Sequence, residues 1–247
     1  MTQRSVAQIV GPTPSKTSSD RSPLGTAAPR ILAIVAWAGL LLQACLSISL
    51  ARANARSVVD GLIVYFGYFT ILTNIFIALV CTAGSLTRRA PGRPLLYRLP
   101  AVGCSTAAIA VVGISYHALL REVWAPQGAE WVANLVLHYI VPVGALLHWF
   151  VYSYEDRPTR WAPLSWCWYP LAYFAYVMTR GEILFSYPYP FIDALALGYT
   201  RTFVNAVGFL IGFIAIGYAL LGLKRVANRF VDSRRGPSPQ LDADSVD

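Results

Sequence analysis

Charged residues are scarce in this chain. Only 13% of its 247 residues are Asp, Glu, Lys or Arg, whereas 56% are hydrophobic, and the mean hydropathy is +0.51. An average soluble domain has about twice that charged fraction. The scarcity of charge excludes an ordinary soluble domain and indicates an integral membrane protein.

Several patterns that carry known chemistries are also missing. The sequence has no glycine-rich phosphate loop and no GxSxG nucleophile elbow. Its cysteines stand singly, with no CxxC and no Cys/His ligand spacing, so we expect small buried apolar residues and neither a metal nor another cofactor. They are Cys45, Cys81, Cys104 and Cys167.

Six segments are long and apolar enough to cross a hydrocarbon core, which takes about 20 helical residues. They lie near residues 31–51, 62–86, 100–120, 131–153, 164–180 and 199–223. The fifth is the weakest because it is short and contains Pro170, which membrane helices tolerate when neighbours satisfy the freed carbonyl. The sequence predicts an all-α polytopic membrane protein, with a six-helix transmembrane domain over residues 31–225.

The two ends of the chain differ from this domain in composition. Residues 1–30 and 226–247 are rich in Ser, Thr, Pro, Gly and charged residues, so we expect disordered tails. With six spans, 15 of the 20 Lys and Arg residues fall on the side of these tails. The positive-inside rule then predicts a cell-membrane protein with both termini in the cytoplasm. Topology and anionic lipid explain the net charge of +8, and no nucleic-acid partner is expected.

An imidazole interrupts the apolar stretch NLVLHYIVPV, residues 134–143. An ionisable group inside a bilayer is costly, so His138 is a candidate functional residue. If its helix begins near Trp131, a rise of 1.5 Å per residue places His138 about 10 Å below the membrane boundary. The same rise, counted from Gly61, places Thr70 about 13 Å below that boundary. A hydroxyl and an imidazole are therefore expected at similar depth on two helices.

Other polar residues gather in the same third of the predicted bundle. Asn134 lies one turn before His138, while Thr73 and Asn74 share a helix face with Thr70. We expect a polar pocket at this level. Its candidate substrate-binding residues are Asn134, Asn74, Thr73, His117, Arg180 and Glu182.

Thr70 and His138 together suggest nucleophilic acyl transfer. A threonine hydroxyl attacks a carbonyl only when a nearby base takes its proton, and imidazole suits that exchange near neutral pH. Taken alone, each residue has a structural interpretation: a membrane threonine commonly bonds to its own helix carbonyl, and a histidine can link two helices. His148 stands beside Trp149 and is expected at the membrane interface.

Three short motifs resemble the signatures of the androgen-induced protein family of six-helix membrane hydrolases, with the bacterial branch as the more similar one. They are YFT at 68–70, NLVLH at 134–138 followed by VP at 141–142, and YPYPF at 187–191. The resemblance covers residues 31–225 in helix count and motif order. It implies hydrolysis of fatty acid esters of hydroxy fatty acids, with Thr70 matching the nucleophile, His138 the catalytic histidine and Asn134 the preceding asparagine.

The chain departs from the animal members around its first motif. Gly67 precedes YFT in place of a basic or bulky residue, and Thr73 and Asn74 follow it. Thr70 and Thr73 therefore both stay candidates for the reactive hydroxyl. The segment SYPYPF, residues 186–191, has its own interpretation as a short lid over the pocket, or as an ordinary aromatic anchor.

Two classes of function follow from these patterns. The first is a lipid-ester hydrolase, whose partners are a lipid or fatty acid ester substrate and the surrounding membrane lipids. The second is a non-enzymatic lipid-binding or transport protein, with a site built from His138, Arg180, Glu182 and Arg201. The absence of an internal sequence repeat counts against a secondary transporter. A purely structural scaffold is a third interpretation.

Overall fold

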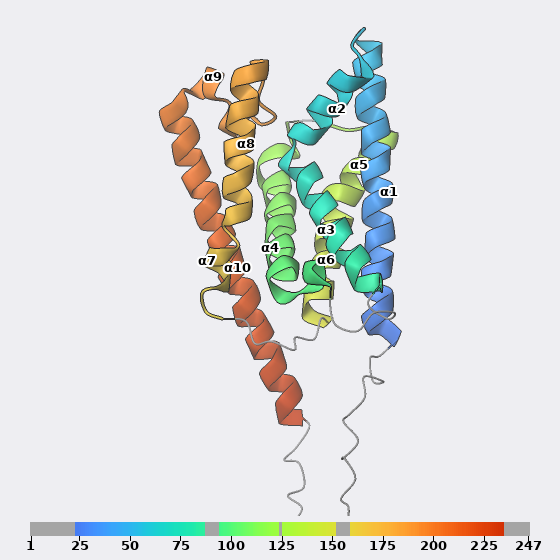
Figure 1. Cartoon of the computed structure of the whole chain (residues 1–247), viewed down its shortest axis with the longest axis vertical. Coiled ribbons are helices and arrows are strands. Elements are labelled where there is room, and N and C mark those ends of the chain that lie inside the picture. The colour runs from blue at the N-terminus through green and yellow to red at the C-terminus, as the bar shows by residue number, and fades with distance from the viewer. Residues whose placement is uncertain (1–22, 87–93, 124, 152–158, 235–247) are drawn as a thin grey trace, which may run out of the picture.

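The computed structural model describes residues 23–86, 94–123, 125–151 and 159–234, and all regular elements among them are helical. Five of its helical segments are long and apolar enough to cross a membrane, and Figure 1 shows them packed as one bundle. The protein is therefore an all-α polytopic membrane bundle. The five segments are Ala27–Ala53, Phe69–Leu86, Leu99–Leu120, Ala129–Phe150 and Tyr199–Ala227.

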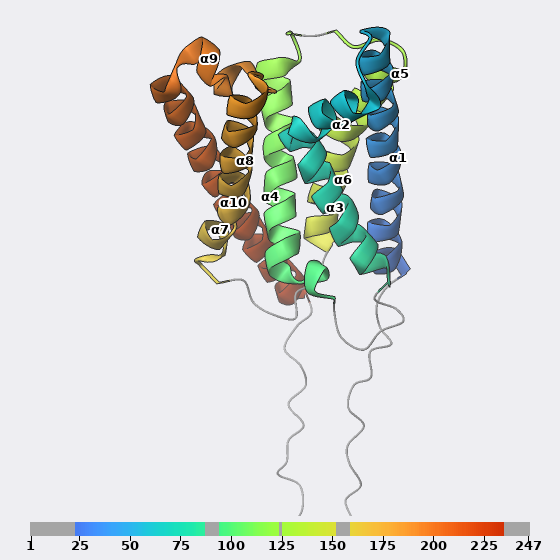
Figure 2. The same cartoon turned by 45° about the horizontal axis from the view of Figure 1, so that its top comes forward.

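The terminal helices are longer than the sequence predicts. Helix α1 covers Pro23–Ala53, and α10 covers Tyr199–Arg234. Residues 23–30 and 226–234, which the sequence assigned to the disordered tails, therefore belong to helices in the structure. The rest of both predicted tails lies outside the described residues. The first turn of α1 and the last turns of α10 lie at the same end of the bundle (Figure 2).

The span predicted at 62–86 is broken into two helices. Helix α2 (Val58–Gly67) begins with a capping box between Ser57 and Asp60, and α3 covers Phe69–Leu86. Tyr68 separates them in an extended conformation, with φ −84° and ψ 131°. Such a break leaves carbonyls without partners in their own helix, and in a membrane they need other donors.

Helix α8 (Trp168–Leu184) supplies those donors. They reach carbonyls in the last two turns of α2, so α8 is fastened beside the break. The three bonds are Tyr173 Oη to the Gly67 carbonyl at 3.0 Å, Tyr176 Oη to the Phe66 carbonyl at 3.2 Å, and Arg180 Nη2 to the Ile63 carbonyl at 3.2 Å.

The fourth predicted span contains a π-helical turn at its centre. Helix α5 (Ala129–Leu135) continues through the π turn Val136–Ile140 into α6 (Val141–Val151). The N–H of Val141 bonds to the carbonyl of Val136, one residue further back than in an α-helix. Pro142 gives a physical reason, because it has no N–H for the carbonyl of His138 and its ring crowds that carbonyl. Such turns occur frequently at functional sites.

A short 3₁₀ turn, Leu95–Tyr97, precedes α4 (Leu99–Ser115). A second π turn, Tyr116–Leu120, extends α4 at its C-terminal end. Its Tyr116 ring stacks on the His138 ring, with centroids 4.0 Å apart. The two helices approach closely here, since a Cβ on Gly113 would lie 3.2 Å from the His138 carbonyl oxygen.

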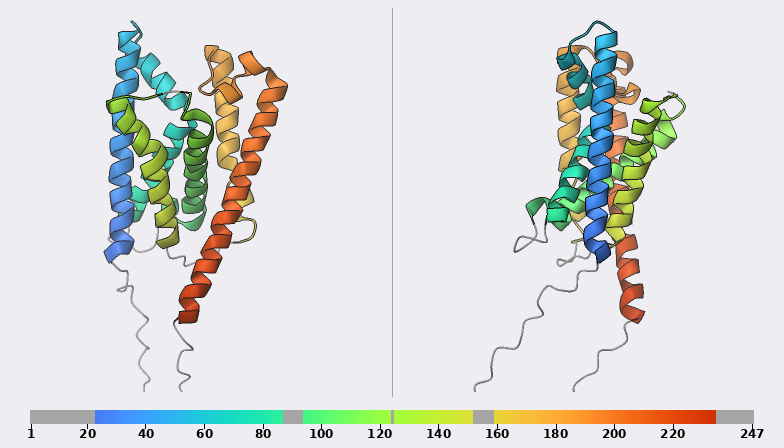
Figure 3. Two further views of the ribbon diagram at one scale, coloured as in Figure 1. Left: turned by 180° about the vertical axis from the view of Figure 1, so that it is seen from behind. Right: turned by 90° about the vertical axis from the view of Figure 1, so that its right-hand side faces the viewer.

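The fifth predicted span is divided into α7 (Ala162–Ser165) and α8. Although α8 is shorter than the five long segments, it runs beside α10, which slants along the bundle in Figure 3. The chain then passes through the 3₁₀ turn Pro190–Ile192 and α9 (Ala194–Leu197) before α10. Three cysteines are buried as expected, but Cys45 is exposed.

Candidate functional site

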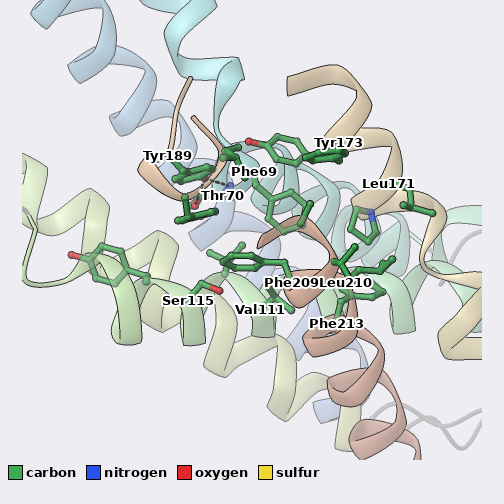
Figure 4. A pocket seen from close by; sticks show the side chains of 18 of the residues that line it. Phe69, Thr70, Val111, Ser115, Leu171, Tyr173, Tyr189, Phe209, Leu210 and Phe213 are labelled. Carbon is green, nitrogen blue, oxygen red and sulfur yellow. Dashed lines mark hydrogen bonds between the residues drawn. The ribbon is translucent and has the colours of Figure 1, made fainter. Parts of the chain in front are cut away.

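A cavity of about 230 Å³ lies among α3, α4, α8, α10 and the turn around Phe191 (Figure 4). Aromatic and aliphatic side chains form most of its wall, whereas the sequence led us to expect a polar pocket. The hydroxyl-bearing residues in the wall are Thr70, Ser115, Tyr116, Tyr173 and Tyr189. The cavity therefore suits an apolar molecule that presents a polar group at a few defined positions.

Thr70 lies in the cavity wall, in the first turn of α3. Its Oγ1 atom is 3.4 Å from Nε2 of His138, which comes from the π turn of the fourth span. His138 is not itself in the wall, because Tyr116 covers the face of its ring and lines the cavity instead. The structure thus brings the two candidate catalytic residues together, and Thr70 is the one that lines the cavity.

The second nitrogen of His138 determines which tautomer fits this geometry. Nδ1 lies 3.2 Å from the backbone carbonyl oxygen of Asn134. Since a carbonyl oxygen can only accept, the neutral imidazole fits best with its proton on Nδ1 and a free lone pair on Nε2. The ring therefore offers an acceptor to the Thr70 hydroxyl, which is the arrangement that a general base needs.

Tyr189 is a member of the site that the sequence did not identify. Its Oη atom accepts from the Thr70 backbone N–H at 3.3 Å and lies 3.4 Å from Thr70 Oγ1. The segment interpreted as a lid therefore folds into the bundle, and Tyr189 is buried. The YPYPF motif marked this segment, but sequence spacing could not show that Tyr189 meets a residue far earlier in the chain.

Asn74 and Asn134 are buried beside the Thr70–His138 pair. The Asn74 amide donates to the Thr70 carbonyl at 2.8 Å and to the Leu137 carbonyl at 3.3 Å, so it ties α3 to the π turn. Asn134 orients His138 through its backbone carbonyl. Neither asparagine lines the cavity, so both are placed to position the pair rather than to contact a bound molecule.

The other four candidate substrate-binding residues do not line the cavity. Thr73 is fully buried, and its hydroxyl is 3.1 Å from Tyr169 Oη. Their remaining partners are as follows: His117 contacts Tyr139 and Arg121, Arg180 donates to the carbonyls of Ser186 and Ile63, and Glu182 accepts from Tyr187 and Tyr199.

Arg180 and Glu182 therefore fasten the end of α8 to its neighbours instead of facing the cavity. Among the described residues, no group of three His, Cys, Asp or Glu side chains could hold a metal ion.

Comparison with known proteins adds no assignment: no family model, curated protein or solved structure matches the chain.

Proposed function

We propose that this protein is a membrane-embedded hydrolase of lipid esters, with fatty acid esters of hydroxy fatty acids as the substrate class. Thr70 is the nucleophile and His138 the general base. The main support for the proposal is a threonine in the wall of an apolar cavity, whose hydroxyl oxygen lies 3.4 Å from an imidazole nitrogen. The motif resemblance to the androgen-induced family supports the same roles.

The reaction proceeds in two acyl-transfer steps. Thr70 Oγ1 attacks the ester carbonyl carbon while its proton passes to Nε2 of His138. The tetrahedral intermediate collapses, the alcohol oxygen leaves, and it takes that proton from the imidazolium. Water then attacks the acyl-threonine with His138 as base, which releases the fatty acid and restores the hydroxyl. The Thr70–His138 distance is long for a hydrogen bond, and such contacts commonly shorten when substrate binds.

Two features near Thr70 can stabilise the negative charge of the tetrahedral intermediate. The phenol of Tyr189 accepts from the Thr70 N–H, which leaves its own hydrogen available for the substrate oxygen. The break at Tyr68 also gives α3 an N-terminus beside Thr70, where its positive dipole end favours an anion. Both features are fixed before substrate arrives, as electrostatic catalysis requires.

The second candidate function is lipid binding or transport without hydrolysis, which the largely apolar wall of the cavity favours. For localisation we propose the cell membrane with both termini in the cytoplasm, because most Lys and Arg residues fall on the side of the termini.

The test is hydrolysis of a fatty acid ester of a hydroxy fatty acid by the purified full chain in detergent. We expect the ester turnover of Thr70→Ala to fall to background. Thr70→Ser should retain turnover, since serine keeps the hydroxyl. Thr73→Ala is the matched control, because Thr73 is a buried hydroxyl on the same helix but outside the cavity wall. Loss of turnover in Thr73→Ala alone would show that Thr73, and not Thr70, is the nucleophile. Absence of turnover by the wild-type protein on several lipid esters would favour the binding function.

A further inference from the structure

The cavity is elongated along α10. Its wall includes α10 residues from Phe203 to Phe213, a stretch of about 15 Å at 1.5 Å per residue. Thr70 and Phe213 lie on opposite sides of the cavity in Figure 4, and Phe213 is almost fully buried. An apolar space of this length with the hydroxyl-bearing Thr70 on one side suits a single acyl chain.

Three wall residues also lie on the outer surface of the bundle. Leu171 of α8 is 51% exposed, while Phe203 and Val207 of α10 are 53% and 55% exposed. In a membrane this exposed surface faces lipid tails. The cavity wall therefore includes residues exposed along the seam between α8 and α10, where the rings of Phe174 and Phe203 meet edge to face with centroids 5.3 Å apart.

The opposite flank of α10 is closed. The ring of Phe191 stacks on Phe209 with centroids 4.6 Å apart. The amide of Asn205 also donates to the Phe191 carbonyl at 2.8 Å, which ties this turn to α10. Of the two flanks of α10, only the α8 side has half-exposed wall residues.

We propose that the cavity is an acyl-chain site that fills sideways from the bilayer through the seam between α8 and α10, with Phe174 and Phe203 as its gate. This inference rests on the proposed function only for placing the ester carbonyl at Thr70. Lipid tails are as apolar as the cavity wall, so transfer of the chain from bilayer to cavity supplies little net hydrophobic free energy. Selective binding therefore depends on polar contacts at Thr70 and Tyr189.

The experiment uses the full chain in phosphatidylcholine vesicles that contain a fatty acid with a diazirine in its chain. After illumination, mass spectrometry locates the labelled residues. We expect labels on the cavity-lining Phe209, Leu210 and Phe213. We also expect Val207→Trp, which narrows the seam, to reduce these labels several-fold.

Val204→Trp is the matched control, because Val204 is 66% exposed on the same helix but does not line the cavity. It should leave the labelling unchanged. Phe203→Ala removes one gate ring, so the fatty acid should label the cavity residues faster in this variant. It provides a second test if Val207→Trp folds poorly.

The result separates the two proposals. If Val207→Trp reduces the cavity labels but the wild-type protein hydrolyses no ester, the acyl-chain site stands and the hydrolase is overturned. Absence of cavity labels, or equal labels in Val207→Trp and Val204→Trp together with no change in Phe203→Ala, would overturn the acyl-chain site even if ester hydrolysis is observed.

Discussion

Two histidines of the same helical segment, Ala129–Phe150, contact hydroxyl groups in different surroundings. His138 meets the aliphatic hydroxyl of Thr70, a residue of the cavity wall. Nε2 of His148 lies 3.1 Å from the phenol of Tyr97, within packed side chains at the end of the bundle where the termini lie. His148 is buried, two residues before the end of its apolar segment.

The surroundings of His148 are those of a structural contact. Lys224 is buried and donates to the carbonyls of Trp149 and Phe150, near the end of α6 where carbonyls lack partners within the helix. Trp149 is fully buried and donates to the Leu220 carbonyl. A histidine–hydroxyl contact thus becomes a candidate catalytic pair only where the hydroxyl is nucleophilic and a substrate can reach it.

The largest effect should separate the two histidines. His138→Ala removes the proposed base, so turnover should fall by about 10²-fold or more. His148→Ala should lower the melting temperature and leave kcat within a few-fold of wild type. Ester hydrolysis and thermal unfolding of both variants measure the contrast. Equal loss of turnover in the two would remove the distinction between the sites.

Tyr189, which contacts Thr70, and Tyr97, which contacts His148, provide the next comparison. Tyr189→Phe removes the phenol proposed to stabilise the oxyanion, and kcat should fall on the order of 10²-fold with KM changed less. Tyr97→Phe removes the partner of His148 and should reduce stability by about 1 kcal/mol without that loss of kcat. An unchanged kcat in Tyr189→Phe would show that Tyr189 only packs against Thr70.

The smallest effect concerns the π turn that carries His138. Pro142→Ala supplies an N–H opposite the His138 carbonyl, so the turn can relax toward an α-helix. We expect higher thermal stability and lower kcat, because the imidazole shifts relative to Thr70. The control is Pro29→Ala within α1, a similar change far along the chain from the site. It should leave kcat unchanged, and full activity of Pro142→Ala would show that the π turn does not position His138.

Hydropathy and residue spacing predicted much of the fold and part of the candidate site. Long apolar segments determine the all-helical bundle, because an unpaired backbone cannot lie in lipid. A fixed rise per residue placed Thr70 and His138 at similar depth. The same helix-length reasoning missed the helical ends of both terminal segments, where polar composition did not prevent a helix from continuing.

Tertiary structure decided the rest. The break at Tyr68 is stabilised by donors from Tyr173, Tyr176 and Arg180 on a helix more than a hundred residues later. No local pattern reports partners at that separation. For the same reason the contact between Tyr189 and Thr70, and the cavity formed between helices, followed only from packing. The sequence by itself determined which segments are apolar enough to enter a membrane. Helix packing decided which of their residues face one another, because that depends on contacts between residues distant in the chain.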